Sequence, residues 1–120
     1  MAKFTRFEDV GAWQKARTVT KSIYLLTMKG LFTRDFGLVD QIRRASVSIM
    51  ANIAEGFGRR SDKEFANFLN IAHGSAAEVQ SHLYVAIDLG YINQEEFNQT
   101  YALLSETSKM TMNLATYLRQ

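Results

Sequence analysis

Ser75, Glu78 and His82 are the residues whose types and spacing come closest to a catalytic set in this 120-residue chain. Steps of three and four residues place them on one side of a helix, where they imitate a nucleophile, an acid and a base. A hydrolytic site also needs a nucleophile turn and loops that shape a pocket, and the surrounding sequence has neither. The three residues therefore predict a polar contact between helices, and we expect no catalytic residues.

Metal and cofactor sites are also not expected. The two histidines, His73 and His82, lie nine residues apart, so on one helix they point in opposite directions and cannot share a metal. The chain has no cysteine, which removes thiolate ligands and disulfides and suits a reducing compartment. The glycines around Phe57 lack the strand that precedes a phosphate-binding loop. We expect neither a metal nor a cofactor.

Positive charge is concentrated in the N-terminal half. Residues 1–63 hold 12 Lys and Arg against 6 Asp and Glu, whereas residues 64–120 hold 2 against 6. Basic side chains on one face neutralise phosphates with little sequence preference, and Phe57 or Tyr91 could stack on bases. The residues predicted to bind nucleic acid are Lys15, Arg17, Lys21, Arg43, Arg60 and Lys63. For Lys15, Lys21, Arg60 and Lys63, the alternative is an ordinary solvated surface.

A polar row follows the second helical segment in steps of four and three residues. The favoured interpretation is structural, with an ion pair between Glu55 and Arg59 and hydrogen bonds from Asn52 to a neighbouring helix. The alternative interpretation adds the two arginines of the row to the nucleic-acid surface. The predicted network comprises Arg44, Ser48, Asn52, Glu55, Arg59 and Ser75.

Apolar periodicity and helix-ending signals predict one all-α domain over residues 1–120, with helices at about 8–29, 36–58, 62–89 and 94–118. Gly30 and Gly90 end helices, and Ser61 with Glu64 forms a capping box. Short connections favour an antiparallel, up-down-up-down four-helix bundle.

The second helical segment carries apolar residues on two opposite sides, and the fourth carries two apolar rows. A small monomer covers one stripe of each helix, so the surplus predicts self-association. The predicted oligomer interface comprises Val47, Met50, Ala51, Leu103, Met110, Leu114 and Tyr117.

No apolar run approaches the roughly 20 residues that cross a bilayer, and acidic residues interrupt the N-terminal segment where a signal peptide would be apolar. We expect a cytoplasmic protein with no membrane partner.

Several motifs resemble a known family along nearly the whole chain. They include Gln41-Ile42-Arg43-Arg44-Ala45, Asn52-Ile53-Ala54-Glu55-Gly56 and Leu89-Gly90-Tyr91-Ile92. The chain is similar to the bacterial four-helix-bundle proteins encoded inside intervening sequences of 23S rRNA genes. Met50, and the connector over residues 31–36, stand where the family often has proline. The resemblance implies a ring-like homopentamer, and the family is also similar to the nucleic-acid-binding accessory protein of diversity-generating retroelements, whose partner is a reverse transcriptase.

These observations favour a non-enzymatic homo-oligomeric scaffold that binds RNA or DNA through its basic half, in an rRNA intervening-sequence or retroelement-like context. The alternative is a pure protein-interaction module whose basic face docks an acidic partner or its own acidic half. A nuclease that uses Glu55 or His82 on rRNA is the least favoured hypothesis.

Overall fold

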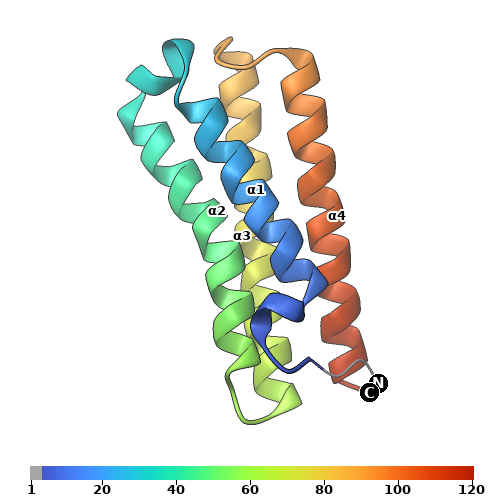
Figure 1. Ribbon diagram of the computed structural model, residues 1–120. Coiled ribbons are helices and arrows are strands. Elements are labelled where there is room, and N and C mark those ends of the chain that lie inside the picture. The colour runs from blue at the N-terminus through green and yellow to red at the C-terminus, as the bar shows by residue number, and fades with distance from the viewer. Residues whose placement is uncertain (1–3) are drawn as a thin grey trace.

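The computed structural model describes residues 4–120, and all the regular structure in them is helical (Figure 1). This confirms the all-α class and the four long helices. In chain order the elements are a 3-10 turn η1 (Phe7–Asp9), α1 (Gly11–Thr27), a 3-10 turn η2 (Gly30–Arg34), α2 (Phe36–Phe57), α3 (Asp62–Asp88) and α4 (Gln94–Leu118).

The first helix is shorter than its sequence pattern predicts, because its first turn is a separate element. Val10 has an extended backbone, with φ −74° and ψ 118°, and it breaks the helix between η1 and α1. Its side chain is fully buried. Asp9 accepts hydrogen bonds from Thr5 and Arg6, which folds the preceding residues back on themselves. The sequence pattern predicted one continuous helix here, but the backbone at Val10 leaves the helical conformation and its side chain is buried.

The four helices lie side by side in a bundle that measures 45 × 22 × 19 Å (Figure 1). α2 contacts α1 and α3, α4 contacts α3, and α1 closes the bundle against α4. The α2–α3 connection lies at the same end as η1 and the C-terminus, and η2 lies at the other end beside the α3–α4 connection (Figure 1).

Helix ends follow local signals. Gly30 and Gly90 have φ of 61° and 74°, the left-handed region that glycine enters without a steric penalty. Asn93 and Glu96 form a reciprocal capping box at the start of α4. Ser61 accepts a hydrogen bond from the Glu64 backbone N–H. A complete capping box would also have the Glu64 carboxylate accept from the Ser61 backbone N–H. That part of the prediction was wrong, because the Glu64 carboxylate accepts from the Ser61 hydroxyl instead.

The core is a continuous cluster of side chains from all four helices. Its largest fully buried members include Ile23 of α1, Ile49 and Ile53 of α2, Leu83 of α3 and Leu104 of α4. Apolar residues recur on one side of each helix because the bundle buries one stripe per helix. Burial of this shared surface provides the main driving force for folding.

The η2 connector is held by aromatic packing. Phe32 is fully buried, and its ring stacks on Tyr91 with centroids 5.2 Å apart. The Tyr91 hydroxyl donates a 2.9 Å hydrogen bond to Asp35, which raises the pKa of that phenol. Asp35 also accepts from the Leu38 backbone N–H and so caps α2. These contacts join the two connections at this end of the bundle.

The seven residues predicted at an oligomer interface fall into two groups. Four of them, Met50, Leu103, Met110 and Leu114, are partly buried against the core of their own chain. Met110 packs directly against Gly11 of α1, since a Cβ on this glycine would lie 2.9 Å from Met110 Cε. The other three, Val47, Ala51 and Tyr117, are exposed to solvent. The apolar surface left over is therefore smaller than the sequence suggested.

Candidate nucleic-acid interface

Positive and aromatic side chains from two helices meet on the outer side of the α1–α2 pair. Thr20 of α1 approaches α2 there, with its hydroxyl 3.2 Å from the carbonyl oxygen of Ser46. Steps of four and three residues place Trp13, Arg17, Lys21 and Tyr24 in register along α1. The basic strip, as we call this surface, comprises Trp13, Arg17, Lys21 and Tyr24 of α1 with Arg43 and Arg44 of α2.

One end of the basic strip is a cation–aromatic pair on α1. The Arg17 guanidinium lies 6.0 Å from the centroid of the Trp13 ring. The Phe7 ring packs edge to face with Trp13, with ring centroids 5.1 Å apart. Lys21 lines the same shallow hollow as Trp13 and Arg17. The arrangement offers an aromatic surface beside two positive charges, as proteins that bind single strands often do.

The other end is a second cation–aromatic pair that bridges the helices. The Arg43 guanidinium lies 4.4 Å from the centroid of the Tyr24 ring. Its Nε also donates a 2.9 Å hydrogen bond to the hydroxyl of Thr27, which is fully buried. Arg44 lines the same hollow but is ion-paired with Asp40 at 2.9 Å. Arg43 is therefore held in one position before any ligand arrives, which lowers the entropic cost of binding.

Lys15 does not belong to the basic strip, although the sequence placed it with Arg17 and Lys21. It points to the α4 side of α1 and forms a 3.0 Å ion pair with Glu106. Lys29 pairs with Glu96 in the same way at 2.6 Å, which holds the pKa of that carboxyl below its usual range. Part of the contrast between the basic and acidic halves is thus neutralised within the chain, between α1 and α4.

Arg60 and Lys63 lie far from the basic strip. Arg60 lies in the α2–α3 connection and Lys63 in the first turn of α3, whereas Arg43 lies 14 residues before the end of α2, so about 20 Å separates them from it along the bundle. The six residues predicted to bind nucleic acid therefore lie in three separate places. Arg17, Lys21 and Arg43 belong to the basic strip, and Lys15 faces α4. Arg60 and Lys63 lie at the end of the bundle where α2 connects to α3.

The polar row of α2 faces α3 for part of its length. The Ser48 and Ser75 hydroxyls lie 3.0 Å apart, which joins α2 to α3. The predicted hydrogen bonds from Asn52 to a neighbouring helix were wrong, because Asn52 donates to the hydroxyl and carbonyl oxygens of Ser48 within α2. Arg59 pairs with Glu55 at 2.6 Å and lies over the Phe68 ring. Arg44 takes no part in these contacts, because it pairs with Asp40 one turn earlier.

The residues that resemble a hydrolytic set do not form one. The Ser75 hydroxyl is engaged with Ser48, and His82 Nε2 lies 3.5 Å from a Glu78 carboxylate oxygen. His82 Nε2 is buried and has no hydrogen-bond partner within residues 4–120. Over the same residues, no three or more His, Asp or Glu side chains gather as a metal site would require.

Two members of the basic strip were not predicted from the sequence. Trp13 stands four residues before Arg17, a spacing that brings two side chains together on a helix and could have revealed this pair. Tyr24 and Arg43 come from different helices, so their contact depends on how α1 and α2 pack. No spacing within either helix carries that information.

The fold and this surface define a small helical-bundle protein with a charged, aromatic-bearing face and no membrane-spanning helix within residues 4–120. The chain belongs to the 23S rRNA-intervening sequence protein family, whose model matches residues 8–113. This confirms the family resemblance drawn from the sequence motifs.

A crystal structure from Bacteroides thetaiotaomicron VPI-5482 is similar over most of the chain. It is described as a protein with unknown function from the S23 ribosomal protein family. The two chains are 26% identical, the match covers 88% of this chain and 95% of the other, and the TM-score is 0.80. No curated protein matches the chain.

Proposed function

We propose that the protein is a non-enzymatic, homo-oligomeric scaffold that binds single-stranded RNA or DNA through the basic strip. The observation that carries the proposal is the pair of cation–aromatic contacts, Arg17 with Trp13 and Arg43 with Tyr24, on one face. Arginine and lysine neutralise phosphates, and exposed aromatic faces stack on bases without a sequence requirement. Membership of a family named for 23S rRNA intervening sequences is consistent with an RNA partner.

The assembly that we propose is a ring, five-fold as the family resemblance implies, of antiparallel up-down-up-down bundles. Apolar side chains that stay exposed on α3 support self-association: Ile71 and Val85 are 51% and 42% exposed. A ring would also repeat the basic strip and raise its affinity by avidity.

Charge reversal in the basic strip should weaken RNA binding strongly. We expect Arg17→Glu with Lys21→Glu to lower the affinity for a labelled single-stranded RNA by about tenfold or more at moderate salt, because two phosphate contacts are lost. The slope of log affinity against log salt should fall by about 0.7 for each contact removed. Fluorescence anisotropy over a salt series measures both quantities.

The matched control reverses one charge in α4 and one directly after it, Lys109→Glu with Arg119→Glu, which changes the net charge equally away from the strip. We expect a loss below about threefold, since screening weakens distant charges. Equal losses of RNA affinity in the two double variants would show that binding depends on net charge and not on the basic strip. Absence of binding by the unaltered protein at low salt would overturn RNA binding and favour the protein-interaction module.

The exposed apolar residues of α3 should hold the assembly together. We expect light scattering to report a mass several times that of the 13.6 kDa chain, and Ile71→Lys to lower it, since a charge would be buried in the contact.

Leu25→Lys is the matched control, because Leu25 is 55% exposed and lies on α1, away from this surface. Its mass should equal that of the unaltered protein. A monomeric mass for the unaltered protein at every concentration would contradict the assembly.

A further inference from the structure

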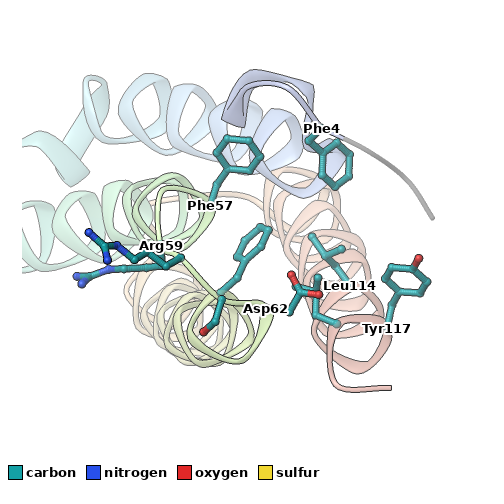
Figure 2. Close-up of a pocket in the computed structure, with 10 residues that line it drawn as sticks. Phe4, Phe57, Arg59, Asp62, Leu114 and Tyr117 are labelled. Atoms are coloured by element: carbon teal, nitrogen blue, oxygen red, sulfur yellow. The ribbon is translucent and has the colours of Figure 1, made fainter.

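A hollow of about 320 Å³ lies at the end of the bundle where the α2–α3 connection meets α4, and its size is within the range of small-molecule sites (Figure 2). It is distinct from the basic strip, and none of the contacts described above fills it. Its principal lining residues are Phe4, Phe57, Arg60, Asp62, Phe65 and Leu114.

The walls of this terminal hollow are aromatic and aliphatic. Phe57 and Phe65 meet edge to face, with ring centroids 6.1 Å apart and planes at 87°. This contact depends on Gly56, since a Cβ there would lie 3.0 Å from Phe65 Cδ1. Figure 2 shows Phe4 and Leu114 on the far side of the hollow from the α2–α3 connection. A flat ring would find aromatic faces on more than one side.

The charged side chain that lies against the terminal hollow is the carboxylate of Asp62. Figure 2 shows the Asp62 carboxylate on the side that faces Leu114. Ser61 caps α3, so Asp62 is free of that role, and within residues 4–120 it makes no side-chain hydrogen bond or ion pair. Arg59 pairs with Glu55, and Figure 2 shows that neither arginine side chain of the lining extends toward Asp62.

We propose that the terminal hollow binds a guanine base, with the base between the aromatic walls and its amino edge on Asp62. Guanine presents two adjacent donors, N1–H and the N2 amino group, and a carboxylate accepts both at once. Adenine, cytosine and uracil each place an acceptor beside the donor, which would face the carboxylate unfavourably. Aromatic side chains supply stacking, which carries much of the affinity for unpaired bases.

The inference rests on the proposed function, because a single strand on the protein is one source of such a base. A free guanine nucleotide is the other source and has the same chemistry. The two sources are separable by experiment, and so are the two proposals, because a mononucleotide is too short to need the basic strip.

Isothermal titration with four mononucleotides tests the site. We expect guanosine monophosphate to bind most tightly, inosine monophosphate, which lacks the N2 amino group, more weakly, and the adenosine and uridine nucleotides at least about tenfold more weakly. Asp62→Asn should lower the affinity for the guanine nucleotide about tenfold or more and remove its advantage over the inosine nucleotide. Equal binding of all four nucleotides, or no binding of the guanine nucleotide at millimolar concentration, would overturn the inference.

Asp88→Asn is the control variant, since Asp88 is an exposed acid at the other end of α3. It should bind the guanine nucleotide as the unaltered protein does, and an equal loss in both variants would count against Asp62. Comparison of two labelled oligonucleotides, one with a single guanine and one with uracil in its place, then identifies the source. A preference for the first that Asp62→Asn abolishes supports a base in the strand. No preference, with the mononucleotide still bound, supports a free nucleotide.

Discussion

Phe32→Ala should lower the free energy of unfolding by about 3–5 kcal/mol, the range found when a fully buried phenylalanine is truncated in a core. Phe32 is fully buried in η2 and stacks on Tyr91, whose hydroxyl reaches the capping residue Asp35. Loss of the ring leaves a cavity and frees Tyr91, so the two connections at this end lose their common contact. A shift of the urea midpoint at fixed protein concentration measures the loss.

Phe36→Ala is the control for this variant, because Phe36 lies four residues further on and is 80% exposed. Its truncation should change the free energy of unfolding by less than about 0.5 kcal/mol, as exposed substitutions usually do. If both phenylalanine variants lost stability equally, η2 would not owe its place to the buried ring.

Alanine should have opposite effects at two helical glycines. At Gly56 the new Cβ would lie 2.6 Å from Phe68 Cβ and 3.0 Å from Phe65 Cδ1, so α2 and α3 must move apart. We expect a net loss of about 1–2 kcal/mol, because overpacking outweighs the better helix propensity of alanine. At Gly74 the Cβ meets nothing within 4 Å, and we expect a gain of up to about 1 kcal/mol.

The two glycine variants control for each other, because the chemical change is the same and only the surroundings differ. Thermal and urea unfolding should rank Gly74→Ala above the unaltered protein and Gly56→Ala below it. A stabilised Gly56→Ala protein would mean that the close approach of α2 and α3 is not required there. The same variant should also disturb the terminal hollow, since Phe65 lines it.

The helical architecture could be predicted from the sequence because its signals are local. Gly30 and Gly90 end helices through their own backbone conformation, and Asn93 caps α4 through a neighbour three residues away. Apolar periodicity then identifies the buried side of each helix. None of these signals needs knowledge of which helix lies opposite.

The candidate sites were harder to predict because they depend on packing between helices. Lys15 and Arg17 are two residues apart, yet one pairs with Glu106 of α4 and the other lies over Trp13. Apolar periodicity also identified Met50 and Leu114 without revealing that the same chain partly covers them. The terminal hollow collects residues from four separate segments, and no motif in the sequence connects them.

The ion pairs between α1 and α4 have a consequence for how the molecule meets a polyanion. Lys15 and Lys29 are matched by glutamates on one flank of α1, whereas Arg17 and Lys21 project from the other flank beside Arg43. Between these two flanks of α1, the positive charge that has no glutamate beside it therefore lies on the α1–α2 side. If the protein binds a polyanion as we propose, this charge would favour encounters in which the α1–α2 flank faces the phosphate chain.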